Sequence, residues 1–129
     1  MSAAEVHPSA IVYPGTVLGA GVKVLEHAVV GKQPTLSPRS TAKREALPPT
    51  VIGNGTVIST GAIVFAGSTV GDRVILGARS CVRERVTIGD DVILWSACHV
   101  GHESVIGEHC FVSSHAVVSG LVTVEPGCF

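Results

Sequence analysis

The chain has six histidines, and four of them fall within a stretch of seventeen residues: His99, His102, His109 and His115. Imidazole titrates near neutral pH, so a histidine can remove the proton of an attacking amine or hydroxyl group. Glu103 directly follows His102, and a neighbouring carboxylate can fix the tautomer of such a base and stabilise the imidazolium. The stretch therefore predicts general-base chemistry, with metal binding as the alternative.

A repeat of six residues predicts the elements that position these side chains. An Ile, Leu or Val occupies every sixth position from Ile52 to Val124, and the fifth residue of each of these hexads is small or β-branched, from Thr56 to Cys128. A period of six is a multiple of two, so each repeat starts on the same face of a strand, whereas a helix would scatter these residues around its axis. We expect an all-β prism of short strands joined by turns.

Glycine often follows the aliphatic residue, and Asp, Asn or Glu often comes next. The glycines are Gly53, Gly71, Gly77, Gly89, Gly101 and Gly107. We expect them to supply the tight turns at the corners of the prism, because glycine accepts backbone conformations that other residues avoid.

This pattern of an aliphatic residue, glycine and four further residues resembles the hexapeptide-repeat acyltransferase superfamily. The resemblance implies a single left-handed parallel β-helix with three hexads per coil, against the usual right-handed crossover. It also implies a homotrimer with active sites in the clefts between parallel prisms. The flat apolar walls expected from the repeat favour self-association on physical grounds as well.

The segment "VGHESVIGEHCFVSSHAVVSG" is similar to the stretch around the catalytic histidine in the sialic-acid O-acetyltransferase and bacillosamine-type sugar N-acetyltransferase branch. That similarity implies His102 as general base, Glu103 as the acid that orients it, and Gly120 as the glycine beside the thioester of acetyl-CoA. We expect Ser119, Gly120 and His115 to be the cofactor-binding residues, with backbone N–H groups near Ser119 and Gly120 stabilising the tetrahedral intermediate.

The implied reaction moves an acetyl group to an amino or hydroxyl group of a sugar nucleotide or a similar small acceptor, and the sequence leaves N- and O-transfer open. Two features depart from the branch. Its amino-terminal βαβ nucleotide-sugar domain has no counterpart in this sequence, and His115 stands where a small residue is common.

Glu84 is a rival for the place of Glu103. If three hexads make one coil, Glu84 lies directly beneath His102, about 4.8 Å away at the spacing of neighbouring strands. The motif favours Glu103 as the partner of His102, with Glu84 as the alternative.

Two other classes of function fit the same fold. The γ-type carbonic anhydrases share it and hold zinc between subunits with three histidines, but they use an H-x4-H pair, whereas the histidines here are spaced by 3, 7 and 6 residues. We therefore expect no metal. A non-catalytic scaffold is the third class, and it would bind no coenzyme A.

The repeat divides the chain into first β-helix hexads at 1–30, an inserted loop at 31–51 and the main β-helix at 52–129. The loop contains four prolines and cannot pair as a strand. Its cations suit the phosphates of a nucleotide-bearing ligand, although a solvated surface loop is an equally good interpretation: Lys32, Arg39, Lys43 and Arg44, against Glu45.

Composition narrows the remaining classes. The net charge of −1 argues against nucleic acid as a partner, and no apolar run or signal pattern supports a membrane span or secretion, so we expect a cytoplasmic protein. The four cysteines lack C-x2-C spacing, and Cys98 is expected to fill an inward slot rather than act as a nucleophile. The chain stops in the middle of a coil, which predicts a truncated polypeptide or an open end covered by something else.

Two aromatic residues, Phe65 and Trp95, occupy the position that other hexads give to glycine. We expect both to point outward from the prism and to contact a partner, with another copy of the chain as the simplest one.

Overall fold

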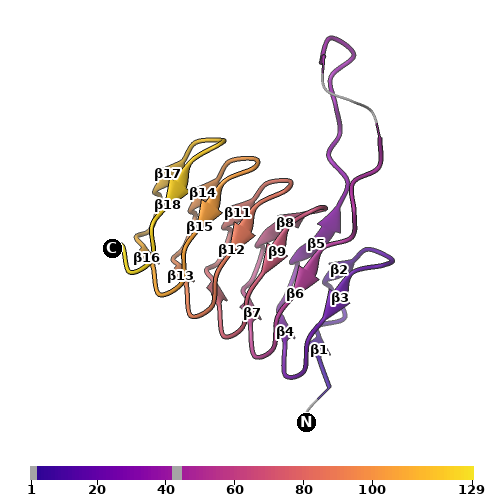
Figure 1. The fold of residues 1–129 in the computed structure, drawn as a ribbon. Coiled ribbons are helices and arrows are strands. Elements are labelled where there is room, and N and C mark those ends of the chain that lie inside the picture. Colours follow the sequence, from indigo (N-terminus) through magenta and orange to yellow (C-terminus); the bar gives the residue numbers. More distant parts are fainter. Residues whose placement is uncertain (1–2, 42–44) are drawn as a thin grey trace.

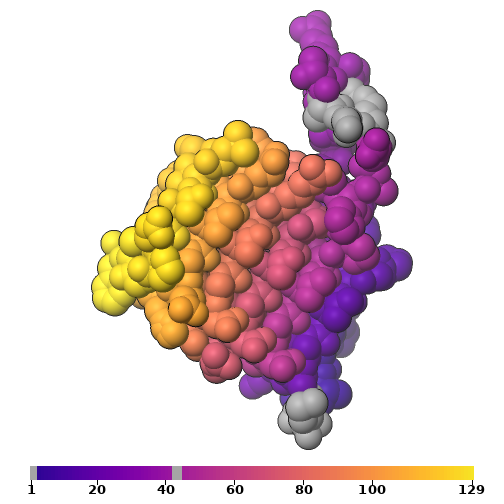
Figure 2. Space-filling view, viewed as in Figure 1, coloured from indigo at the N-terminus to yellow at the C-terminus, as the bar shows by residue number. Residues whose placement is uncertain are grey.

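The computed structural model describes residues 3–41 and 45–129, and within these residues it contains eighteen short strands and no helix. The strands form three parallel six-stranded sheets that wind into a left-handed β-helix of about six coils (Figure 1). The space-filling view shows a solid body from which one loop stands out (Figure 2). The predicted fold class is confirmed. No helix that could cross a membrane occurs in the part of the chain that the structure describes.

Each coil contributes one strand to each sheet, so every third strand is a neighbour. The first sheet contains β1 (Glu5–Val6), β4 (Lys23–Val24), β7 (Val57–Ile58), β10 (Ile75–Leu76), β13 (Ile93–Leu94) and β16 (Phe111–Val112). The second contains β2 (Ile11–Val12), β5 (Val29–Lys32), β8 (Ile63–Phe65), β11 (Cys81–Val82), β14 (His99–Val100) and β17 (Val117–Val118). The third contains β3 (Val17–Leu18), β6 (Val51–Ile52), β9 (Thr69–Val70), β12 (Thr87–Ile88), β15 (Val105–Ile106) and β18 (Thr123–Val124).

The register between coils is eighteen residues from coil three onward. Ile75 pairs with Ile93, and Val82 with Val100, so each inward aliphatic side chain stacks on the equivalent one in the next coil. From Ile52 to Ile106, the Ile, Leu or Val residue that opens each hexad is fully buried. These residues form the core together with the small residues at the fifth position of each hexad. The two periodic positions read from the sequence are thus the two that fill the prism.

Three polar residues in the small inward slot are satisfied by the backbone of the next coil, whereas the buried Ser80 hydroxyl, in the same slot, has no hydrogen-bond partner among the described residues. The hydroxyls of Thr56, Ser68 and Ser104 donate hydrogen bonds to carbonyl oxygens fifteen residues further along the chain. The Cys98 thiol is buried in the same way, and its Sγ lies 2.9 Å from the Ser113 carbonyl oxygen. Burial raises the pKa of Cys98, so the expected packing role fits this residue better than nucleophilic chemistry.

The glycines that follow the aliphatic residues were expected to supply turn conformations, but the structure gives them a different role. Positive φ angles occur three residues after each aliphatic position, at glycines such as Gly55 but also at ten other residues, including Arg85 and Glu103. The glycines directly after the aliphatic residue do not need positive φ. At Gly77 an added Cβ would lie 2.5 Å from the carbonyl carbon of Trp95 in the next coil. At these glycines the backbones of successive coils approach too closely for a side chain, although the row of corners that contains Gly77 carries Ser59 and Trp95 in the adjacent coils.

We predict that Gly77→Ala destabilises the protein more than Gly61→Ala, although Gly61 has a positive φ angle of +71° and Gly77 has no positive φ angle. At Gly77 the methyl group meets backbone, and overpacking of this kind costs about 3 kcal/mol. At Gly61 its nearest neighbour is Cγ of the flexible Arg79 side chain, at an ordinary contact distance of 3.5 Å, and the left-handed conformation costs about 1 kcal/mol.

Urea unfolding of the two variants beside the wild type measures the difference. Ala97 already occupies the position equivalent to Gly61 two coils later, with a φ of 60°, so the fold tolerates alanine there. A larger loss of stability in Gly61→Ala would show that turn conformation, and not the approach of the coils, governs the corners.

Candidate active site

His102 lies at the corner between β14 and β15, with its side chain exposed. Its backbone carbonyl accepts a hydrogen bond from the Leu121 N–H group of the next coil, and the Glu103 N–H group donates to the Glu84 carbonyl of the coil before. The three corner positions Glu84, His102 and Gly120 are therefore stacked one above another. This is the stacking that the eighteen-residue coil predicts.

The His102 imidazole packs over Gly120. A Cβ added at Gly120 would lie 2.6 Å from the His102 Nδ1 atom and 3.1 Å from its Nε2 atom. The backbone at Gly120 does not need positive φ, so what requires a glycine here is the histidine ring rather than the turn. The Gly120 N–H group makes no hydrogen bond within the described residues. The neighbouring Ser119 carbonyl accepts the Ser104 hydroxyl at 2.8 Å.

Glu84 is held on the other side of His102. Its Oε1 atom lies 2.9 Å from Nε of Arg83, and the Arg83 guanidinium stacks 4.0 Å from the centroid of the Phe65 ring. The Glu84 side chain is only 20% exposed. Glu103, by contrast, is exposed and its carboxylate has no partner among the described residues. Neither carboxylate is hydrogen-bonded to His102 in this structure.

The expectation that Phe65 is an exposed aromatic is wrong. Phe65 is only 7% exposed, because Arg83 covers its ring. Trp95 is 46% exposed, as expected, and its ring lies 6.4 Å from that of Phe111.

The inserted loop leaves the prism at the same row of corners as His102. It joins β5 to β6, the same two sheets that the His102 corner joins three coils later (Figure 1). Strand β5 ends at Lys32 and β6 begins at Val51, so residues 33–50 form the insertion, and no strand occurs in the described part of it.

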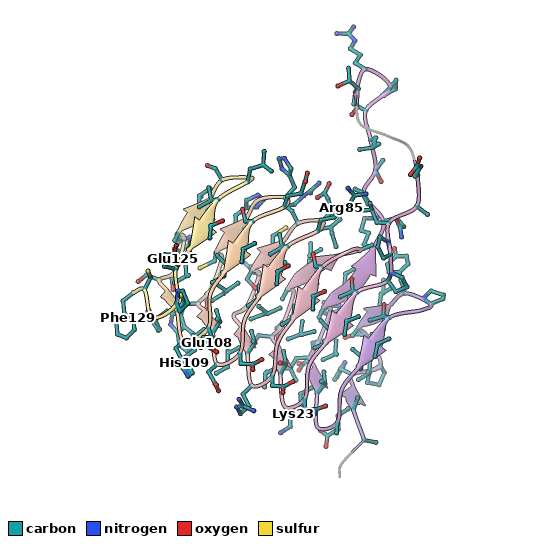
Figure 3. All side chains as sticks on the ribbon, in the orientation of Figure 1. Lys23, Arg85, Glu108, His109, Glu125 and Phe129 are labelled. Carbon is teal, nitrogen blue, oxygen red and sulfur yellow. The ribbon has the colours of Figure 1, made fainter. Side chains whose placement is uncertain are left out.

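A groove of about 550 Å³ lies between the base of the insertion and the His102 corner. Six of its lining residues come from the insertion: Gln33, Pro34, Leu36, Glu45, Ala46 and Leu47. The other four belong to two stacked corners: Glu84, Arg85, His102 and Glu103. Figure 3 shows Arg85 beside the base of the insertion. The groove therefore brings together the predicted base, both candidate carboxylates and a wall that the repeat does not supply.

The sequence interpretation missed the insertion as part of this site, although a signal was present. Val30, Val64, Val82 and Val100 stand in one sheet, and the insertion follows Val30 as His102 follows Val100. Counting hexads in threes across the insertion would have placed the insertion and His102 at the same row of corners. Arg85 was missed for a simpler reason, because nothing in a single arginine marks it as facing a groove.

The other histidines of the cluster lie elsewhere. His99 is on β14, His109 is at the corner before β16, and His115 is at the corner before β17. His109 and His115 both have positive φ, a conformation in which histidine is enriched, so turn geometry accounts for part of the cluster. His115 does not line the groove, and the structure does not bring it together with Ser119 and Gly120 at the His102 corner.

The cations predicted to bind phosphates are not those that line the groove. Lys32 and Arg39 are absent from its walls, and Lys43 and Arg44 lie outside the described residues. Among the described lining residues Arg85 is the one cation, against the carboxylates of Glu45, Glu84 and Glu103. No group of three or more His, Cys, Asp or Glu side chains suited to a metal ion occurs within 3–41 and 45–129.

Residues 85–120 match the family described as bacterial transferase hexapeptide, six repeats. Over these residues the chain is similar to the hexapeptide-repeat transferases. It is 27% identical, over 97% of its length and 54% of the relative's, to the acyl-[acyl-carrier-protein]–UDP-N-acetylglucosamine O-acyltransferase of Sinorhizobium fredii. This hexapeptide-repeat chain thus spans about half the length of that relative.

Solved structures show the same fold. A histidine-to-alanine variant of GDP-perosamine N-acetyltransferase from Caulobacter crescentus, in complex with CoA and GDP-perosamine, is 26% identical with a TM-score of 0.80. The match covers 96% of this hexapeptide-repeat chain and 50% of that one. The acetyltransferase domain of PglB from Neisseria gonorrhoeae shares the fold at 21% identity and a TM-score of 0.54, over 96% of this chain and 47% of that domain's chain.

We predict that Gly120→Ala displaces the His102 ring without unfolding the hexapeptide-repeat helix. The new methyl group would overlap the imidazole, and the side chain can rotate away toward solvent because His102 is exposed. A crystal structure of the variant should show a changed His102 rotamer, with a loss of stability of about 1 kcal/mol in urea unfolding. Ser119→Ala is the matched control and should leave the ring in place. An unmoved His102 ring in Gly120→Ala would contradict this explanation of the glycine.

Proposed function

We propose that this protein is an acyl-CoA-dependent acyltransferase, which moves an acetyl group from acetyl-CoA to an amino or hydroxyl group of a sugar nucleotide or a similar small acceptor. The observation that carries the proposal is the position of His102, an exposed imidazole that faces a groove of about 550 Å³ together with two carboxylates. A site with a general base and a groove of this size suits group transfer better than a scaffold, which needs neither.

In the proposed mechanism His102 removes the proton of the acceptor as its nitrogen or oxygen attacks the thioester carbonyl. Glu103 stabilises the imidazolium that forms, because its carboxylate has no other partner in the described part of the chain, whereas that of Glu84 is paired with Arg83 at 2.9 Å. The Gly120 N–H group, which lies next to the His102 ring, is our candidate for a donor to the developing oxyanion.

The relatives support the choice of substrates. The perosamine N-acetyltransferase structure is a complex with CoA and a nucleotide-linked sugar, and the O-acyltransferase of S. fredii is named for a UDP-linked acceptor. The name of the latter gives an acyl carrier protein as donor, so acyl-CoA and acyl carrier protein should be compared directly. In this proposal the protein acts in the cytoplasm, where the free thiols of Cys81, Cys98, Cys110 and Cys128 stay reduced.

His102→Ala should retain acetyl-CoA binding and lose acetyl transfer. Removing a general base lowers kcat by about 10²- to 10⁴-fold, while the donor keeps its other contacts. Calorimetric titration with acetyl-CoA measures binding, and release of the CoA thiol in the presence of GDP-perosamine and other nucleotide-linked sugars measures transfer. No acetyl-CoA binding by the wild-type protein would contradict the proposed donor and favour a scaffold or an acyl-carrier-protein donor.

The same assay assigns the carboxylate partner of His102. Glu103→Gln should lower kcat by about tenfold or more, because the imidazolium loses its stabilising charge. Glu84→Gln is the matched control, since this substitution also removes one carboxylate charge from the groove, and it should lower kcat less. Normal turnover of Glu103→Gln with loss in Glu84→Gln would reverse the assignment.

We also propose that the protein is a homotrimer, with CoA between neighbouring prisms and His115 near the cofactor. Large apolar side chains on its outer surface support self-association, among them Trp95, Phe111 and Val117. Analytical ultracentrifugation should give three times the chain mass of 13.2 kDa. A monomer at micromolar concentration would contradict the trimer, and Trp95→Glu should weaken the association.

A further inference from the structure

We propose that Gln33 is a positioning residue that fixes one wall of the groove and thereby determines which acceptor reaches His102. The inference rests on the proposed acyltransferase function. Its structural part, a side-chain clasp at the base of the insertion, can be tested without any activity.

Gln33 joins the two limbs of the insertion through both ends of its amide. Its Nε2 atom donates to the Leu47 carbonyl at 3.0 Å, and its Oε1 atom accepts the Leu47 N–H group at 2.9 Å. One side chain thus satisfies the two backbone groups of a residue fourteen positions away, as a paired strand would. The limbs contain Pro34, Pro48 and Pro49, which lack N–H groups, so a backbone ladder at this place would lack donors.

Below the clasp, both limbs are bound to the coil that contains β8. The Lys32 carbonyl accepts the Ala66 N–H group at 2.8 Å, and the Pro48 carbonyl accepts the Gly67 N–H group at 2.6 Å. The buried Thr50 hydroxyl donates to the Phe65 carbonyl at 3.0 Å. The base of the insertion is therefore hydrogen-bonded to the prism, and the clasp between Gln33 and Leu47 joins the two limbs just beyond these contacts.

The residues that line the groove begin at the clasp. Gln33 and Leu47 are lining residues themselves, and Pro34 and Leu36 on one limb and Glu45 and Ala46 on the other complete this wall. Each of them lies within three residues of a clasp partner. Losing the clasp should therefore separate the limbs where they face His102, while the contacts to the β8 coil remain.

The charges of the groove indicate which substrate meets this wall. Among the lining residues that the structure describes, three carry carboxylates, Glu45, Glu84 and Glu103, and one carries a guanidinium, Arg85. The Glu84 carboxylate is itself paired with Arg83. The exposed carboxylates of Glu45 and Glu103 disfavour the phosphates of CoA at this wall, whereas a neutral hydroxyl or a cationic amino group is not repelled. We infer that the amine- or hydroxyl-bearing end of the acceptor occupies the groove and that CoA reaches His102 from outside it.

The test compares Gln33→Ala, Gln33→Glu and the control Thr35→Ala. Thr35 is exposed, lies between Pro34 and Leu36, and does not line the groove. Gln33→Glu keeps an oxygen for the Leu47 N–H group but has no donor for the Leu47 carbonyl, so it retains half of the clasp. Both positions are exposed, and the core is unchanged by each of the three substitutions.

The rate of hydrogen exchange at the Leu47 amide measures directly whether the clasp is formed, because this N–H group donates to Gln33. We expect Gln33→Ala to accelerate this exchange by about fivefold or more, because a lost hydrogen bond of ordinary strength changes local opening by about that factor. Gln33→Glu should accelerate it less, and Thr35→Ala should not change it. Unchanged exchange in Gln33→Ala would overturn the clasp, whether or not the protein is an enzyme.

Steady-state kinetics test whether Gln33 affects the selection of the acceptor, through the KM for the acceptor and the KM for acetyl-CoA. GDP-perosamine is the first acceptor to be used. Gln33→Ala should raise the acceptor KM by about five- to tenfold and leave the KM for acetyl-CoA unchanged, because only the acceptor contacts this wall. Faster exchange with an unchanged acceptor KM, or an equal rise in both KM values, would overturn the selecting role while the acyltransferase function stands. A wild-type protein that acetylates no acceptor would overturn the function and the selecting role together.

Discussion

The close approach of successive coils is the constraint from which the site follows. Backbone meets backbone at glycines such as Gly77 and Gly101, and the parallel pairing that this allows repeats every eighteen residues. Any side chain at a corner is then placed directly above the equivalent one in the coil before it. His102 stands between Glu84 and Gly120 for this reason alone, and no contact specific to the site is needed to bring the three together.

That constraint supplies only one side of the groove. A stack of corners is convex and open to water, so a base placed there has nothing to hold a substrate against it. The insertion provides the missing wall, and its base is ordered by hydrogen bonds to the coil of β8 and by the Gln33 clasp. The repeat positions His102, and the insertion, which departs from the repeat, forms the facing wall of the groove.

The parts of this protein that follow the repeat could be predicted from the sequence, and the parts that depart from the repeat could not. The repeat predicted the prism, its inward residues and the stacking of Glu84 beneath His102, because periodic residues report a periodic backbone. It misjudged the glycines, since a sequence does not distinguish a residue chosen for its φ angle from one chosen for lack of space. It also misjudged Phe65, whose exposure depends on Arg83, a residue of the next coil. The groove depended on the path of 33–50, which has no period to read.

The insertion leaves the prism at a register irregularity between Val30 and Lys32 of β5, and the pairing of the coils on either side is otherwise regular. Val17 pairs with Val51, at a separation sixteen residues greater than that of Ile75 and Ile93, yet both pairs belong to regular parallel sheets. The length of the chain at this corner is therefore decoupled from the rest of the fold. The segment between β5 and β6 can therefore vary in length and sequence while the coils that support His102 stay the same, so the wall of the groove and the proposed base can change independently of each other.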